Sequence, residues 1–514
     1  HAEAHRSGHR DDGYQVGVTV GENHPNIVLI AVDQWRGDCL SILGHPDVRT
    51  PYLDQLAGGG AQMTQAYAAC PTCVPSRMGL MTGTAPTTHR RIGYQDGITF
   101  DMPVTLPGAL RDAGYQTQAI GKMHYWPERG RIGFDDVILH DGYLHYSRHR
   151  ERDCRMYDDY LTWLREQEGA GAAEDYIDNG LECNSMVARP WDKAEKLHPT
   201  NWVVTEATQW LYRRDPTCPF FLYLSFHRPH APLDPPQWAF DSYDQDELTL
   251  PSEDNWSDEL MSEERRDWDP TALAAHYRER DVRLARAGYY GHMTHIDSQI
   301  SRFIQTLGEF GLAENTVVAF VSDHGDMMGD HGLWRKGYPY EASSHVPFIL
   351  YGAGIAPGTR VDSVVEIRDV MPTLLDVAGV EIPEEVEGRS VLPLIAEADD
   401  EVPWREYLHG EHYLFDQSIQ WIRFGSYKYV WFSGWGVEQL FNIDEDPEEL
   451  VDLCKLSADA RSSEVSDALL RGRNYLIAEL EGREEGYVSE GGLVPGREAV
   501  KVLTHSYPLR EEAR

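Results

Sequence analysis

Basic side chains are scarce in this sequence. Its 514 residues include 46 lysines and arginines against 84 aspartates and glutamates, which gives a formal net charge of −38. This charge opposes binding to nucleic acid and to anionic membrane surfaces, so we expect neither partner. It also repels anionic small molecules, so a site for one must provide local positive charge. The few lysines are therefore informative.

Cysteines and long apolar runs are also few. The seven cysteines lack the spacing of a disulfide framework, which favours a reducing compartment, so we expect a cytoplasmic protein. No apolar run approaches the roughly 18 residues of a membrane span, so no membrane segment is expected. Residues 1–24 have neither an apolar core nor an initiator Met and resemble a tag or a flexible N-terminal segment. If a signal peptide was removed, the protein is periplasmic or secreted instead.

Low-complexity stretches and internal repeats are absent too. The chain exceeds the usual size of a single core, which predicts one large domain and a smaller one. The acidic, proline-containing stretch Glu397–Pro403 predicts the boundary, with residues 25–398 forming the large domain and residues 399–514 a smaller C-terminal domain and tail. The acidic, poorly periodic segment from Asp241 to Pro270 predicts a long surface insertion near the site.

Two continuous apolar, β-branched runs, Asn26–Val32 and Val317–Val321, are typical of strands buried on both faces of a parallel sheet. Further strands are predicted at Gln116–Ile120 and Phe220–Ser225, and helices at Thr105–Ala113, Asn201–Arg213 and Tyr289–Phe310. This alternation predicts an α/β fold with a large, mostly parallel sheet flanked by helices. Later, Gln420–Phe424 and Tyr427–Phe432 predict a small antiparallel sheet.

Carboxylates end two of the predicted strands. Asp33 is followed by Gln34, and Asp323 is followed by His324. The carboxyl ends of parallel strands are where open α/β sheets build their sites. Hard divalent cations prefer oxygen ligands with an occasional imidazole, so these four residues are predicted to bind one ion. The alternative is that each aspartate only caps a turn.

The most specific segment is Cys73-Val-Pro-Ser-Arg77, followed by Met-Gly-Leu-Met-Thr-Gly83. It resembles the signature of type I sulfatases, in which a maturation enzyme oxidises the cysteine to formylglycine. The resemblance implies a hydrated aldehyde at residue 73, with one hydroxyl to attack sulfur and a second to expel sulfate. Arg77 would stabilise that hydrate. The alternatives are a small buried cysteine and a cysteine phosphatase, whose loop needs a glycine-rich cradle and a longer Cys-to-Arg spacing, which this segment lacks.

Three further segments match the same family. Gly121-Lys122-Met123-His124 resembles its Gly-Lys-x-His element, which implies that Lys122 binds the ester oxygens and that His124 is the base acting on the hydrate. In His227-Arg-Pro-His230-Ala-Pro, His230 matches the histidine that contacts sulfate and protonates the leaving oxygen, and His227 is a second substrate-binding candidate. Lys336, after the Asp323-His324 pair, matches a lysine that reaches the sulfate.

The resemblance, from Pro25 to Leu394, implies an alkaline phosphatase-like fold with a smaller C-terminal domain closing one side of the site. It implies an arylsulfatase-like hydrolase of aryl, sugar or small alkyl sulfates, matured by a formylglycine-generating enzyme. The metal is expected to be calcium, with manganese or magnesium second, and residue 73 would complete its ligands. A homo-oligomer is left open.

Gln34 departs from the family pattern, which usually has a second aspartate there, and lowers the ligand charge by one. Glutamine occurs at this place in phosphonate monoester hydrolases. The alternative function is therefore a phosphonate monoester or phosphodiester hydrolase of the same superfamily. A non-enzymatic alternative is a metal-stabilised binding protein in which Cys73 stays unconverted.

Overall fold

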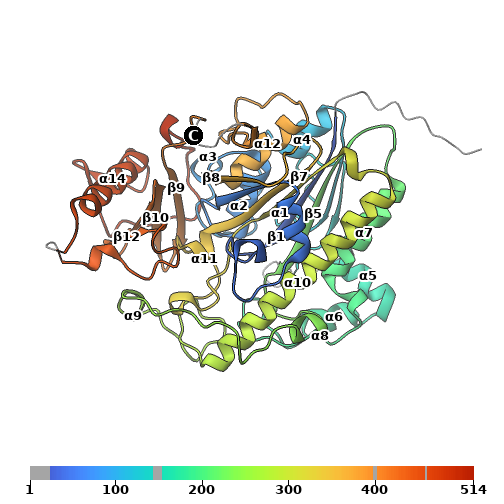
Figure 1. Ribbon diagram of the computed structural model, residues 1–514, viewed down its shortest axis with the longest axis horizontal. Helices are drawn as coiled ribbons and strands as arrows, with labels where there is room; N and C mark the ends of the chain where they lie inside the picture. The colour runs from blue at the N-terminus through green and yellow to red at the C-terminus, as the bar shows by residue number, and fades with distance from the viewer. Residues whose placement is uncertain (1–23, 143–152, 397–401, 458–459) are drawn as a thin grey trace, which may run out of the picture.

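An eight-stranded sheet runs through the larger part of the molecule (Figure 1). The computed structural model describes residues 24–142, 153–396, 402–457 and 460–514. The strands stand in the order β4 (Asp136–Leu139), β3 (Gln116–Gly121), β5 (Phe220–Pro229), β1 (Asn26–Asp33), β6 (Thr316–Ser322), β7 (His345–Gly352), β2 (Ala61–Tyr67) and β8 (Thr359–Glu366). Only β7 runs against the others, which confirms the mostly parallel sheet.

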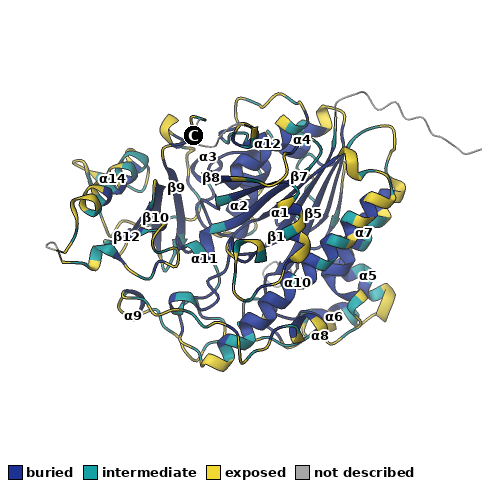
Figure 2. Cartoon of the chain, viewed as in Figure 1, coloured by how far each residue is buried: buried dark blue, intermediate teal, exposed yellow. Residues whose placement is uncertain are grey.

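Helices cover both faces of this sheet. One face carries α1 (Pro51–Gly58), α7 (Pro199–Arg213) and α10 (Glu279–Glu309), and the other carries α2 (Cys73–Thr82), α4 (Leu106–Asp112) and α12 (Val370–Val377). Alternate residues of β1 enter the two cores, with Val28 packed among residues of α7 and α10 and Leu29 among residues of α2 and α12. The central strands therefore appear fully buried in Figure 2, as their continuous apolar sequence predicts.

A second, antiparallel sheet follows, as predicted. Its order is β12 (Val437–Asn442), β11 (Tyr427–Phe432), β10 (Gln417–Phe424) and β9 (Leu408–Leu414), and α14 (Ser463–Leu480) packs on one face. The other face shares a core with the large sheet, because Tyr67 of β2 clusters with Trp421 and Phe441. The predicted boundary at Glu397–Pro403 falls largely on residues 397–401, outside the described residues, as does nearly all of the N-terminal segment 1–24.

The acidic segment from Asp241 to Pro270 is not wholly a surface insertion. Trp256 within it is almost fully buried in the core shared by the two sheets, and its indole N–H donates to the Glu449 carbonyl at 2.8 Å. The cavity described below is lined by Leu273 but by no residue of this segment. The segment thus braces the second sheet against the first.

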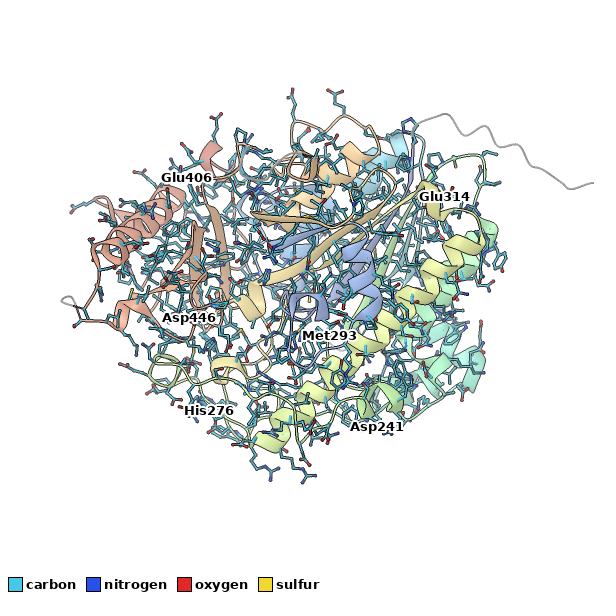
Figure 3. The ribbon with its side chains drawn as sticks, in the orientation of Figure 1. Asp241, His276, Met293, Glu314, Glu406 and Asp446 are labelled. Atoms are coloured by element: carbon cyan, nitrogen blue, oxygen red, sulfur yellow. The ribbon has the colours of Figure 1, made fainter. Side chains whose placement is uncertain are left out.

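Shorter elements complete the described fold. They are α3 (Pro86–His89), α5 (Asp159–Glu168), α6 (Ala172–Ile177), α8 (Gln237–Asp241), α9 (Ser257–Leu260), α11 (Glu341–Ser344), α13 (Leu392–Ala396), β13 (Val488–Ser489) and β14 (Gly492–Leu493). Acidic side chains such as Glu314 and Glu406 are exposed, whereas Met293 of α10 is buried (Figure 3). Among the described residues, no helix has both the length and the apolar character needed to cross a bilayer.

Candidate active site

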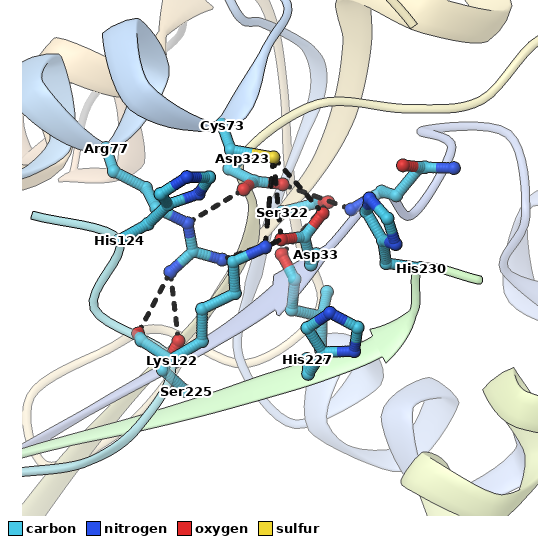
Figure 4. Close-up of polar contacts among 12 residues, drawn as sticks. Asp33, Cys73, Arg77, Lys122, His124, Ser225, His227, His230, Ser322 and Asp323 are labelled. Carbon is cyan, nitrogen blue, oxygen red and sulfur yellow. Dashed lines mark hydrogen bonds and ion pairs between the residues drawn. The ribbon is translucent and has the colours of Figure 1, made fainter. Parts of the chain in front are cut away.

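Four neighbouring strands bring the predicted residues to one edge of the sheet. Asp33 is the last residue of β1, Lys122 follows β3 and Asp323 follows β6. His227 lies within β5, which extends beyond its predicted end, and His230 comes directly after that strand. Since β3, β5, β1 and β6 are adjacent and parallel, their carboxyl ends meet, and Figure 4 shows these side chains gathered around Asp33.

Cys73 is the first residue of α2 and is 2% exposed. Its Sγ lies 3.2 Å from His324 Nε2, 3.3 Å from Lys336 Nζ and 3.9 Å from Lys122 Nζ. Burial and Asp33 act to raise the pKa of the thiol, but the two lysines and His324 outweigh them, so the pKa is lowered. A buried structural cysteine has no such cationic surroundings, which are typical of a reactive one.

Two buried carboxylates face this cysteine. Arg77 Nε donates to Asp323 Oδ2 at 2.9 Å, its terminal nitrogen lies 3.4 Å from Asp33 Oδ2, and Lys122 forms an ion pair with the same oxygen of Asp33. Burial alone would raise the pKa of Asp33, but Lys122, His230, Lys336 and Arg77 together hold it well below its usual value. Asp33 is therefore ionised at neutral pH.

The donor set fits a hard divalent cation. One ligand atom each from Asp33, Cys73, Asp323 and His324 lies within 4.8 Å of all the others. His324 Nδ1 is 3.0 Å from the Gly325 carbonyl, which can only accept, so Nδ1 carries a proton and Nε2 faces the cluster. Two carboxylates and a correctly oriented imidazole are an arrangement that the sequence patterns alone could not establish.

Gln34 lies beside this cluster and has an unusual backbone conformation. Its φ of 74° is left-handed, and its N–H donates to Asp323 Oδ1 at 3.0 Å. Its side-chain oxygen accepts from Lys336 Nζ at 2.8 Å, and its amide nitrogen donates to Asp326. The Gln34 oxygen is thus beside the cluster and is bound by Lys336.

Two of the predicted histidines are fixed by neighbouring groups. The backbone N–H of His124 donates to Asp141 Oδ1 at 2.9 Å, and its ring packs edge-on against Tyr94. The N–H of His230 donates to the Asp33 carbonyl at 3.1 Å, and its ring Nδ1 donates to the Ala231 carbonyl at 2.8 Å. Burial and Lys336 lower the pKa of His230 well below its usual value.

These residues line a cavity of about 490 Å³. We call the lining residues around Cys73 its inner end, namely Cys73, Lys122, His124, His227, His230 and Lys336, and the more exposed Tyr94, Leu273, Tyr413, Leu414 and Phe415 its outer wall. Arg335 also lines it, whereas His331 instead pairs with Asp254 at 2.8 Å. Tyr94, Asp141 and the β9–β10 hairpin are not indicated by any sequence motif, because no local pattern connects residue 415 with residue 73.

Comparison with known proteins agrees with this geometry. The family model described as Sulfatase matches residues 25–380, and the model described as N-sulphoglucosamine sulphohydrolase, C-terminal, matches residues 329–472. An arylsulfatase of Clostridium perfringens is 46% identical over 489 residues, which cover 94% of this chain and 99% of that protein. A choline-sulfatase of Rhizobium meliloti is 30% identical over 85% of this chain and 83% of its own length.

A solved structure has the same architecture. The phosphonate monoester hydrolase of Agrobacterium radiobacter superposes with a TM-score of 0.71 at 25% identity, covering 87% of this chain and 94% of its own. The sulfatase resemblance drawn from the motifs is confirmed over most of the chain. Membership implies a metal and a formylglycine, for which the cluster around Cys73 is suited. The chain therefore belongs to the sulfatase family and is an enzyme that hydrolyses sulfate esters.

Proposed function

We propose that the preferred substrate is the sulfate monoester of an aromatic alcohol and that residue 73 acts as a formylglycine. One observation carries this proposal: the Cys73 sulfur lies at the inner end of a cavity whose outer wall is largely aromatic and aliphatic. There it is close to Lys336 and His324 and faces two carboxylates. The sulfate would occupy the cationic end, and the aryl group would lie between Tyr94, Tyr413 and Phe415.

The cationic side chains would stabilise the negative charge on the oxygens bound to sulfur in the transition state. Lys122 and Lys336 reach Cys73 Sγ from two different elements, so both would bind ester oxygens while one hydroxyl of the hydrate attacks. Arg77 is fully buried and bonded to Asp323, so it would hold that carboxylate and the hydrate in place. A divalent ion held by Asp33, Gln34, Asp323, His324 and hydrated residue 73, with calcium first and manganese or magnesium second, would polarise the bound oxygens.

The two histidines act at different stages. We assign His124 as the base that removes a proton from the second hydroxyl when sulfate is expelled. His230 would protonate the leaving oxygen. Because His230 Nδ1 already donates to Ala231, its Nε2 donates only when the ring is cationic, a form that the negative charge of a bound ester favours.

The proposal is tested by combining mass and turnover. Conversion of Cys73 to formylglycine replaces sulfur and two hydrogens by oxygen and lowers the mass of the chain by about 18 Da. The converted protein should have a lower KM for 4-nitrophenyl sulfate than for sugar or alkyl sulfates, because the aryl group would contact the outer wall of the cavity. Converted protein without sulfatase activity, or full activity in unconverted protein, would refute the mechanism.

A phosphonate monoester hydrolase is the second candidate, because Gln34 departs from the common sulfatase pattern. The similarity to the Agrobacterium phosphonate monoester hydrolase supports testing it. Both activities should be measured on one preparation, with 4-nitrophenyl sulfate and 4-nitrophenyl phenylphosphonate. A larger kcat/KM for the phosphonate would reverse our order of preference.

We further propose a cytoplasmic location and maturation by a formylglycine-generating enzyme. All seven cysteines are free, which supports a reducing compartment.

Co-expression with a formylglycine-generating enzyme should raise the converted fraction of residue 73. Light scattering of the purified protein decides between monomer and homo-oligomer. Fractionation of the native host decides the compartment.

A further inference from the structure

His227 is bonded to a group that can only donate. Arg228 NH1 lies 2.5 Å from His227 Nδ1, and an arginine guanidinium has no acceptor. Nδ1 must therefore accept, and in the neutral ring the proton is on Nε2. Burial, Lys122 and Arg228 lower the pKa of His227 well below its usual value, so the neutral ring is the form present at neutral pH.

The neighbouring His230 has the opposite arrangement. Its Nδ1 bonds the Ala231 carbonyl, which can only accept, so Nδ1 holds the proton and Nε2 is bare in the neutral ring. The two rings lie 5.0 Å apart and both line the cavity (Figure 4). One neutral histidine thus presents a donor, and the other presents an acceptor.

Arg228 is fixed by a buried carboxylate. Its Nε and a terminal nitrogen lie 3.0 and 2.9 Å from Asp234 Oδ1, and both side chains are almost completely buried. His292 Nε2 accepts from the Asp234 backbone N–H at 2.9 Å, and His198 Nε2 lies 3.9 Å from Oδ1. A guanidinium held by a fork of this kind has little freedom to turn away from His227.

His198, Asp234 and His292 are also close enough together to suggest a metal site. The bonds already present argue against one. Asp234 is engaged by Arg228, and His198 Nδ1 accepts from the Thr200 N–H at 3.1 Å, which leaves the His198 proton on Nε2, the only nitrogen that could face an ion. The cation bound by this cluster is the guanidinium group of Arg228.

The His227 ring packs against Gly142 and fits there only because residue 142 has no side chain. A Cβ at Gly142 would lie 2.1 Å from His227 Nε2, and the φ of Gly142 is +67°. Any larger residue there would displace the ring that lines the cavity.

We propose that His227 is a further substrate-binding residue, a neutral hydrogen-bond donor to a non-bridging ester oxygen, and that Arg228 and Asp234 are positioning residues that keep its proton on Nε2. The proposal rests on the sulfatase function proposed above. A neutral imidazole can stabilise developing negative charge in this way without being protonated or deprotonated. Because non-bridging oxygens are common to every sulfate ester, this donor acts whatever alcohol departs.

A matched pair of variants tests the donor. The amide nitrogen of glutamine reaches the place of Nε2, whereas asparagine reaches only that of Nδ1. On converted enzyme with 4-nitrophenyl sulfate, His227→Gln should keep kcat/KM within about tenfold, and His227→Asn should lose roughly a hundredfold. The loss should be equal for esters of poor leaving groups. Equal activity of the two variants, or a loss that grows with the leaving-group pKa, would overturn the proposal.

A double-mutant cycle tests the positioning residues. Removing Arg228 alone would leave Asp234 buried and unpaired, so Arg228→Met is combined with Asp234→Asn. The pair of changes should lower kcat/KM at least tenfold in the native background and less than threefold in the His227→Gln background. Equal losses in both backgrounds would show a merely structural role.

Nitrogen NMR of histidine-labelled enzyme reads the tautomer directly. His227, assigned by its absence in His227→Gln, should show a protonated Nε2 and a bare Nδ1, and the Arg228→Met/Asp234→Asn protein should lose this preference. A protonated Nδ1 in the native enzyme would refute the inference. If the native enzyme turned over no sulfate ester, the proposed function itself would fail, whereas turnover with an unaffected His227→Asn protein would refute only the role of His227.

Discussion

Because the Cys73 side chain is small, its removal should affect turnover far more than stability. Cys73→Ala deletes one sulfur from a buried position, and we expect turnover to be abolished while the melting temperature changes by only a few degrees. Cys73→Ser should be nearly as inactive, since a serine offers one hydroxyl and lacks the second one that expels sulfate. Steady-state kinetics and calorimetry measure the two effects. Activity within tenfold of native for either variant would contradict the formylglycine mechanism.

The assigned histidine roles predict different kinetic signatures. His124→Ala should slow the expulsion of sulfate whatever alcohol has left, so the chain should accumulate the mass of one sulfuryl group during turnover. His230→Ala should harm esters of alkyl alcohols far more than 4-nitrophenyl sulfate, because a nitrophenolate hardly needs protonation. Intact mass and a leaving-group series measure these effects. An absent adduct, or equal losses across leaving groups, would count against the respective role.

The metal assignment predicts a stoichiometry. Exhaustive chelation should abolish turnover, and calcium should restore it better than manganese or magnesium. Elemental analysis should find one ion per chain in the native enzyme and none in Asp323→Asn, which lowers the charge of the carboxylate pair facing His324. One retained ion in that variant would place the metal elsewhere. Asp112→Asn, at an exposed position, is the control and should keep its ion.

At the scale of elements, one buried carboxylate links α10 to α1. Asp297 accepts from the N–H groups of Leu53 and Tyr52 at 2.7 and 3.2 Å. Burial nevertheless raises the pKa of Asp297 to about 7. The folded state then holds this proton more tightly than the unfolded chain, whose value is about 3.9. The stabilisation is complete below that value and is lost as pH rises through 7.

Asp297→Asn should therefore stabilise the protein at alkaline pH. The amide oxygen still accepts from Leu53, but no charge has to be buried. The difference in unfolding free energy from the native protein should grow from pH 4 to 7 by up to a few kcal/mol and then level off. Denaturant titrations at each pH measure it. A difference that shrank with rising pH would show that Asp297 is stabilised as the anion.

Continuous apolar runs made the central strands predictable, whereas some strands without such a run were not predicted. β1, β6, β10 and β11 were predicted to within a few residues because both of their faces are buried. β2, by contrast, reads Ala-Gln-Met-Thr-Gln-Ala-Tyr and owes its place to pairing with β7 and β8. Helix α10 begins ten residues before its predicted start, since its first turns are rich in arginine and aspartate or glutamate.

The candidate site was more predictable than the fold around it. The candidates around Cys73 each adjoin a strand end or a short motif, so local sequence was sufficient to predict them, whereas it did not indicate Tyr94, Asp141 or the β9–β10 hairpin. What local sequence could not give was the direction of each side chain: the Gln34 oxygen bound by Lys336, or the opposite ring orientations of His227 and His230. These depend on partners that folding brings from elsewhere in the chain.

At the scale of the whole molecule, the two sheets are joined by a buried cation. Lys428 of β11 lies 2.7 Å from Glu341 and 2.9 Å from Glu449 and is fully buried. Lys428→Met leaves both carboxylates without their partner and should cost about 3–5 kcal/mol. Calorimetry should show one transition, shifted down as a whole, because the sheets share a core. Lys455→Met, which removes an ion pair with the exposed Glu259, should leave the free energy of unfolding nearly unchanged.

If calorimetry instead showed two transitions and Lys428→Met shifted only one of them, the two sheets would unfold independently. In that case the C-terminal residues 402–514 could be removed without unfolding the rest. We expect the opposite: a chain that ends at residue 396 should aggregate, because Tyr67 and Trp256 would lose the core that covers them.

The outer wall of the cavity has a consequence for the order of events in the cell. Tyr413 and Phe415 belong to the last fifth of the chain, so the ribosome completes this wall hundreds of residues after Cys73 has emerged. Once the wall is in place, Cys73 is almost inaccessible. The maturation enzyme proposed above would therefore have only the interval between translation of Cys73 and folding of the C-terminal strands in which to reach it. Rapid translation or early folding of the tail would leave molecules that are correctly folded, bind metal and are permanently inactive.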